Sequence, residues 1–136
     1  MLWMMAMMSL LGCGKPAPGI VGELDRALIE WSDAESCGDT MSVNDTTTDT
    51  LVMAADDQDL VIKMIKTSRD NFNDDIETRI RVIAETPGGV FRKKNEARLR
   101  LRRASGGRYV GRASAIVRAN PDNIRFDVDF NVPRCP

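Results

Sequence analysis

The sequence predicts a mainly β domain: an antiparallel sheet, strongly curled or closed into a small barrel, with one N-terminal amphipathic helix (α+β). Three observations support this fold class. Beyond Cys37, apolar residues recur at every second position, as in strands with one buried face. Turn-forming residues separate these alternating segments. Before Cys37, apolar residues recur at spacings of three and four, as on one face of a helix.

The predicted helix covers about residues 20–33. Its apolar positions share one face, and its acidic residues Glu23, Asp25 and Glu30 point away from that face. The apolar face consists of Ile20, Val21, Leu24, Ala27, Leu28 and Trp31.

Six strands are expected after Cys37, because apolar and polar residues alternate in six segments bounded by turn residues. Residues 41–44 are a candidate for a further short strand. The six segments are residues 51–54, 60–66, 78–85, 97–103, 109–118 and 124–132.

The last three predicted strands can be aligned by placing apolar residues opposite apolar residues. A four-residue loop over 120–123 and a three-residue loop over 105–107 place the apolar side chains of all three strands on one face. The expected pairs are Ala119 with Ile124, Val117 with Phe126, Ala115 with Val128, Ala113 with Phe130 and Leu99, and Leu101 with Gly111.

The opposite face of these strands is rich in arginine. It holds five arginines against two aspartates, Asp127 and Asp129, so positive charge is in excess. Planar guanidinium groups bind phosphate and carboxylate with two parallel hydrogen bonds. This face is the candidate ligand-binding surface, and its arginines are Arg98, Arg100, Arg102, Arg112 and Arg118.

Charge is also divided along the chain. Residues 20–77 hold 15 acids and 4 bases, whereas residues 78–136 hold 5 acids and 14 bases. One explanation is a basic face for an anionic partner such as lipopolysaccharide, peptidoglycan or nucleic acid. The simpler explanation is that acidic and basic strands pair within one sheet, where each opposite pair stabilises by roughly 0.2 to 1 kcal/mol.

The N-terminal segment is an apolar run, MLWMMAMMSLL, which is too short to span a bilayer as a helix but fits the core of a signal peptide. Leu10-Leu11-Gly12-Cys13 follows and resembles the lipobox of bacterial lipoproteins. The resemblance implies cleavage before Cys13 and a lipid anchor on that residue, with acyl chains such as palmitate. Because Gly14 rather than Asp follows, the resemblance also implies, in a Gram-negative cell, the outer membrane, facing the periplasm.

These features divide the chain into three parts. Residues 1–12 are expected to be a lipoprotein signal peptide. Residues 13–19 form a Pro- and Gly-rich tether that cannot propagate a helix. Residues 20–136 are long enough for a single β-rich domain with one modest core.

The two remaining cysteines are expected to form a disulfide. With Cys13 acylated, Cys37 and Cys135 are an even pair in a compartment where thiols oxidise. Their bond would close a loop of nearly the whole domain.

Catalysis and metal binding are not expected. The chain has no histidine, so no Ser-His-Asp or Cys-His constellation exists, and a zinc site would need cysteines and carboxylates alone. A calcium loop counted from Asn71 has Ile76 where glycine is needed and Val82 where a bidentate acid is needed. Pro87-Gly88-Gly89 is better explained as a turn than as a phosphate-binding loop. We expect no enzyme, no cofactor and no metal.

Ser105-Gly106-Gly107-Arg108-Tyr109 is similar to the Ser-Gly-x-x-Tyr segment of the membrane-bound inhibitors of c-type lysozyme. These inhibitors are small lipoproteins with a β-barrel and a disulfide. The resemblance implies that Ser105 and Tyr109 lie on a loop that enters the lysozyme cleft.

The sequence therefore favours a nonenzymatic, lipid-anchored envelope protein that binds an anionic envelope component through its arginine-rich face. The expected partners are the membrane, reached through the lipid anchor, and an anionic glycan, a lipid headgroup or an envelope protein. Nucleic acid is not expected, because an exported protein rarely meets it. The alternatives are a lysozyme inhibitor and a structural subunit of an envelope assembly.

Overall fold

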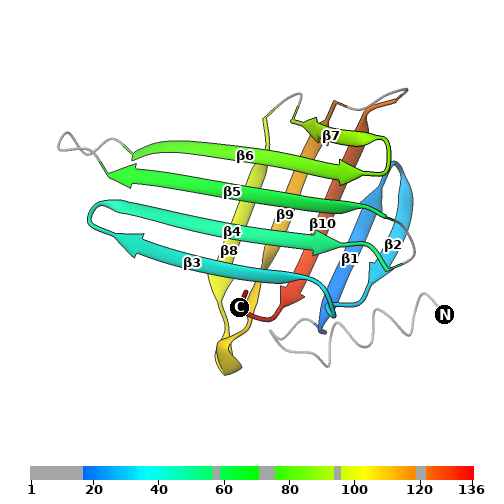
Figure 1. Cartoon of the computed structure of the whole chain (residues 1–136). Helices are drawn as coiled ribbons and strands as arrows, with labels where there is room; N and C mark the ends of the chain where they lie inside the picture. The colour runs from blue at the N-terminus through cyan, green and yellow to red at the C-terminus, as the bar shows by residue number, and fades with distance from the viewer. Residues whose placement is uncertain (1–16, 57–58, 71–75, 94–95, 119–121) are drawn as a thin grey trace.

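The structure, a computed structural model, describes residues 17–56, 59–70, 76–93, 96–118 and 122–136. Within these residues the chain forms two five-stranded antiparallel sheets packed face to face, and the strands of one sheet run across those of the other (Figure 1). The mainly β, antiparallel fold class is confirmed. The expected single curled or closed sheet is wrong, because the strands divide into two separate sheets.

The sheet that contains the first and last strands is called the terminal sheet. Its strand order is β2-β1-β10-β9-β8, so the first strand pairs with the last, Ile20 lying opposite Phe130. The strands are β1 (Gly19–Leu24), β2 (Ala27–Trp31), β8 (Arg98–Arg103), β9 (Tyr109–Val117) and β10 (Ile124–Val132).

The other sheet, called the middle sheet, is a meander of five consecutive strands. Each strand pairs with the next one along the chain, as expected when short turns join alternating apolar segments. The strands are β3 (Cys37–Val43), β4 (Thr46–Ala54), β5 (Val61–Asp70), β6 (Ile76–Thr86) and β7 (Gly89–Arg92).

The helix predicted over residues 20–33 is wrong. This segment forms the β1–β2 hairpin, which turns at Asp25 and Arg26. Both residues have positive φ, 50° and 70°, as a two-residue type I′ turn requires. Such turns favour Asn-Gly or Asp-Gly, and Asp-Arg gives a much weaker signal in the sequence.

The helical spacing misled because it grouped residues from two different faces. Ile20 and Trp31 lie opposite each other and are buried, as an alternating strand pattern requires. Val21 and Leu28, which the helix would have buried, are 44% and 82% exposed. Gly22 occupies an inward position between Ile20 and Leu24, so the strand alternation was hard to see in the sequence.

The six predicted strands are confirmed, with β4 beginning earlier than expected and β7 missed. The β8–β9 register is as predicted, with Leu99 opposite Ala113 and Leu101 opposite Gly111. The β9–β10 register differs from the prediction by two residues: Ile124 lies opposite Val117, not Ala119. A shift of two residues keeps every side chain on its predicted face.

The hydrophobic core lies between the two sheets. Large side chains from both inner faces are almost fully buried there, as expected where two sheets pack about 10 Å apart. They include Ile20, Leu51, Met53, Ile62, Met64, Val82, Leu99, Phe126 and Phe130.

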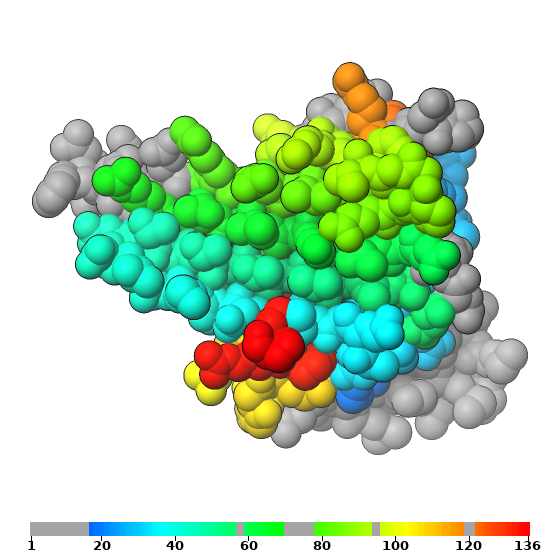
Figure 2. Space-filling view, in the orientation of Figure 1, coloured from blue at the N-terminus to red at the C-terminus, as the bar shows by residue number. Residues whose placement is uncertain are grey.

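The predicted disulfide between Cys37 and Cys135 is confirmed. It joins the first residue of β3 to the C-terminal tail, with 4.8 Å between the two Cα atoms. The tail also pairs with β3, because the Gly38 N–H donates to Pro133 O and the Cys135 N–H donates to Gly38 O, each at 2.9 Å. Figure 2 shows the C-terminal residues, in red, lying against the middle sheet.

Candidate functional site

The candidate site is the outer face of β8, an edge strand of the terminal sheet. Leu99 points into the core and is 2% exposed, so the alternation of the strand turns Arg98, Arg100 and Arg102 outward, where all three are exposed. Residues two apart on a strand are separated by about 6.6 Å. The three guanidinium groups therefore form a row, called the arginine row, along one edge of the molecule.

The arginine row has no carboxylate partner among the described residues. The neighbouring strand β9 places Ser114, Arg112 and Val110 directly opposite Arg98, Arg100 and Arg102. Like charges directly opposite each other on a sheet are destabilising. Because no described carboxylate neutralises them, the three arginines are available to an external anion.

Arg112 belongs to the same face but already has a partner. Its Nε and Nη2 donate to the two carboxylate oxygens of Asp127, at 3.0 and 3.1 Å. This hydrogen bonding raises the pKa of Arg112 and lowers the pKa of Asp127. Asp127 is a diagonal neighbour of Arg112 on the adjacent strand, since Asp129 lies directly opposite Arg112.

The Arg112–Asp127 pair predicts a pH dependence of stability. Because its folded-state pKa is lowered, Asp127 contributes stability above its unfolded pKa of about 3.9, and this contribution is lost as the pH falls through the folded value. We expect Asp127→Asn to lower the free energy of unfolding at neutral pH, with a difference from the wild type that shrinks in acid. Urea unfolding as a function of pH measures this, and Arg112→Gln should behave similarly. If the difference in unfolding free energy between wild type and Asp127→Asn stays constant down to the lowest pH, the ionised Asp127 carboxylate is not the source of the stability.

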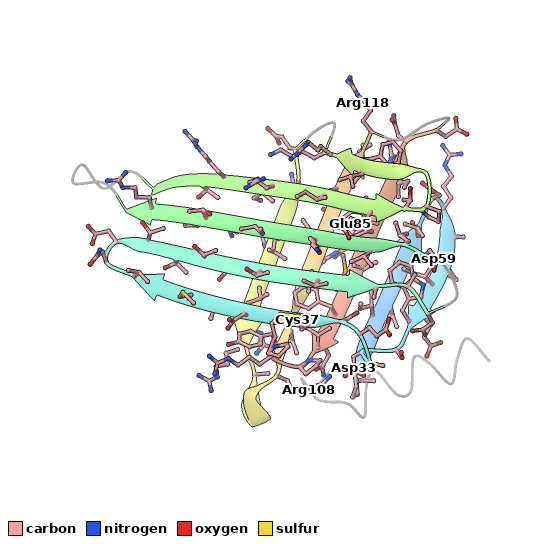
Figure 3. All side chains as sticks on the ribbon, in the orientation of Figure 1. Asp33, Cys37, Asp59, Glu85, Arg108 and Arg118 are labelled. Carbon is pink, nitrogen blue, oxygen red and sulfur yellow. A yellow bond between two sulfur atoms is a disulfide. The ribbon has the colours of Figure 1, made fainter. Side chains whose placement is uncertain are left out.

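Arg118 is on the predicted face but is separated from the arginine row. It follows the end of β9, near β7, where its backbone N–H donates to Arg92 O at 2.9 Å. Figure 3 shows Arg118 at the opposite end of the molecule from Arg108. Arg118 lies four residues beyond Ser114, the partner of Arg98, so the structure places four of the five predicted arginines on the paired segments of β8 and β9 and leaves Arg118 beyond them.

Two basic residues that the sequence did not single out hold this region in place. Lys66, on β5, donates from Nζ to Leu99 O at 3.1 Å, and so tethers β8 to the middle sheet. Arg108 donates to the side-chain oxygen and the backbone carbonyl of Asn131, at 2.6 and 3.0 Å, and forms an ion pair with Asp33. Both contacts join segments distant in sequence, so no local pattern could have indicated them.

Ser105 and Tyr109, the residues of the lysozyme-inhibitor resemblance, lie in different environments. Ser105 begins the exposed turn Ser105–Gly107 between β8 and β9. Tyr109 is 2% exposed, and its hydroxyl donates to Asp39 Oδ1 at 3.5 Å. Tyr109 thus presents almost no surface to a partner protein.

Within the part of the chain that the structure describes, no group of three or more Cys, Asp or Glu side chains is placed to hold a metal ion. Of the loop tested for calcium, residues 71–75 fall outside the described residues, as does the proposed lipid-anchor residue Cys13, whereas the backbone at Ile76 and Val82 belongs to β6. No described helix is long and apolar enough to cross a membrane.

The comparisons with known proteins give no relative. No protein-family model matches this chain, and neither does any curated protein or solved structure. Function must therefore be argued from the site itself.

Proposed function

We propose that this chain is a nonenzymatic, lipid-tethered protein of a bacterial envelope, and that it binds an anionic envelope component through the arginine row. Cys13 carries the lipid in this proposal, and the protein is held at the outer membrane, facing the periplasm. The ligand chemistry is a phosphate or carboxylate group on a glycan or a lipid headgroup.

One observation carries the proposal: Arg98, Arg100 and Arg102 are exposed, aligned and without a carboxylate partner among the described residues. By contrast, Arg108 is paired with Asp33 and Arg112 is paired with Asp127. An exposed ion pair contributes roughly 0 to 1 kcal/mol, but three arginines in a row can each contact one phosphate or carboxylate of the same polyanion, so that several weak contacts act together.

Two further features support an extracytoplasmic location. Cys37 and Cys135 form a disulfide, which is typical of proteins that fold in an oxidising compartment. The described domain begins with β1 at Gly19, directly after the Pro- and Gly-rich segment that would connect it to Cys13.

The test compares two triple variants of equal charge change. Arg98, Arg100 and Arg102→Gln should weaken binding to lipopolysaccharide micelles, or to vesicles containing phosphatidylglycerol, by about tenfold or more. The matched control changes Arg69, Arg81 and Arg92→Gln, three exposed residues on the outer face of the middle sheet.

Loss of binding in the first variant alone would support the proposal. Equal loss in both variants would mean that only net charge matters, and undiminished binding in the first would overturn it. If the wild-type protein binds only lipopolysaccharide or only the phosphatidylglycerol vesicles, the result shows whether the phosphate it recognises belongs to a glycolipid or to a phospholipid headgroup. These measurements use chains that also carry Cys13→Ser, so that the lipid anchor cannot hold them on a bilayer, and vesicles of phosphatidylcholine alone should then not bind.

A further inference from the structure

We propose that the outer face of the terminal sheet is a self-complementary interface through which two copies of this chain associate. The proposal goes beyond anion binding, because it assigns a role to the acidic strands at the far side of the same sheet. It rests on the distribution of charge across this face, strand by strand.

The registers of the four strand pairs define two rows of outward side chains that cross the whole sheet. Both rows begin with an arginine on β8 and reach acidic residues on the far strands. One row is Arg100, Arg112, Asp129, Val21 and Glu30, and the next is Arg98, Ser114, Asp127, Glu23 and Leu28.

Charge therefore changes sign across the face. The β8 and β9 side is basic, and the β1 and β2 side presents Glu23 and Glu30, both exposed. The central strand β10 carries Arg125, Asp127, which is paired with Arg112, and Asp129.

The two ends of the face cannot neutralise each other within one molecule. Arg100 and Glu30 are separated by four strand spacings, about 19 Å. This exceeds the Debye length of about 8 Å at physiological ionic strength. A second copy can bring the two ends together.

A half-turn about an axis parallel to β10, lying between two facing copies, reverses the strand order while keeping the rows level. It places β2 of one copy over β8 of the other, and β1 over β9. Glu30 of each copy then faces Arg100 of its partner, and this happens twice, as in any isologous interface. Because β10 lies over β10 at the axis, Asp129 faces Asp129 of the partner, and this like-charge contact lowers the affinity.

Apolar exposure on the acidic side supports a protein partner. Val21 and Leu28 are 44% and 82% exposed and lie on this face, beside Glu23 and Glu30. In the paired arrangement Leu28 lies over Arg98, whose aliphatic stem can cover it. Burial of these side chains adds a hydrophobic contribution that a free polyanion would not supply.

The interface should be weak and sensitive to salt. A face about 19 Å wide and about 20 Å long offers on the order of 400 Å² of sheet, about half of the ~800 Å² per partner in a standard interface. Since opposite charges supply much of the attraction, 1 M salt should dissociate the dimer, because the Debye length then falls to about 3 Å.

The test uses charge reversal in both halves. The full chain, in a density-matched detergent, is examined by sedimentation equilibrium as wild type, as Glu23→Arg with Glu30→Arg, and as Arg98→Glu with Arg100→Glu. We expect a salt-sensitive dimer for the wild type and monomers for each variant alone. An equimolar mixture of the two variants should form a heterodimer, because one variant is then basic on both sides of β10, whereas the other is acidic on its β8, β1 and β2 strands.

The matched control reverses Arg69 and Arg81, on the outer face of the middle sheet, and should leave the dimer intact. Glutamine replacements at the same four interface positions, which remove the charges without reversing them, should weaken the dimer without repulsion. A monomeric wild type, or variants that do not associate when mixed, would overturn the proposal.

Failure of this proposal can be distinguished from failure of the proposed function. The Glu23 and Glu30 reversals should abolish the dimer but retain or strengthen binding to lipopolysaccharide, whereas the Arg98 and Arg100 reversals should abolish both. Because the same arginines serve both interactions, added lipopolysaccharide should dissociate the wild-type dimer.

Discussion

Replacement of Cys37 and Cys135 by serine is expected to lower the free energy of unfolding by about 4 to 5 kcal/mol. The disulfide closes a loop with a sequence separation of 98 residues, and removing so long a loop restores much conformational entropy to the unfolded chain. The native state also loses the covalent link between β3 and the tail that pairs with it.

Urea unfolding of the wild type, with and without reductant, measures this effect. Reductant should shift the wild-type midpoint to that of the double serine variant and leave the variant unchanged. Cys13→Ser provides the matched control and should not alter the midpoint. A wild-type midpoint insensitive to full reduction would show that the disulfide contributes no stability.

Replacement of Gly111 by alanine is expected to destabilise the domain by about 3 kcal/mol and to displace β8. A Cβ at this position would lie 1.8 Å from Arg100 O and 3.0 Å from Phe130 Cζ. Neither neighbour can move easily, since the first is backbone and the second belongs to a core side chain that is 1% exposed. The cost should therefore reach the upper end of the range for overpacked sites, or exceed it.

The change should also weaken anion binding, because Arg100 lies on the strand that must move. Thermal unfolding and lipopolysaccharide binding measure the two effects. Gly106→Ala is a suitable comparison, because a Cβ there meets no atom within 4 Å, although its φ of 80° adds some backbone strain. Equal stability losses in both variants would mean that β8 and β9 are less closely packed than the structure indicates.

The arginine row could be predicted from the sequence because strand alternation alone determines it. Leu99 and Leu101 must face the core, so Arg98, Arg100 and Arg102 must face outward whatever the rest of the fold is. The common face of Arg112 and Asp127 was also predictable, because a register error of two residues leaves both residues on the same face, but the predicted register placed Asn131 opposite Arg112 and so did not give their ion pair.

The arrangement of the sheets could not be predicted, because it depends on pairings between distant segments. Nothing local in the sequence places Ile20 opposite Phe130 or divides the strands between two sheets. The β1–β2 hairpin was mistaken for a helix because exposed Val21 and Leu28 completed a helical spacing. The change from basic to acidic side chains across the terminal sheet could not be predicted either, because it depends on the pairing of β1 and β2 with β10.

The pairing of the first strand with the last has a consequence for the order of assembly. The middle sheet is a meander of neighbouring segments, so its hairpins can form as soon as residues 37–92 are free to fold. β1 and β2 pair with each other, but among the described strands only β10 joins this hairpin to the rest of the sheet, with Gly19 opposite Asn131. The hairpin therefore cannot join the sheet before β10 is in place. Loop-closure entropy delays such distant contacts. The terminal sheet, and with it the face that carries both charges, is thus completed last, when the C-terminal residues dock.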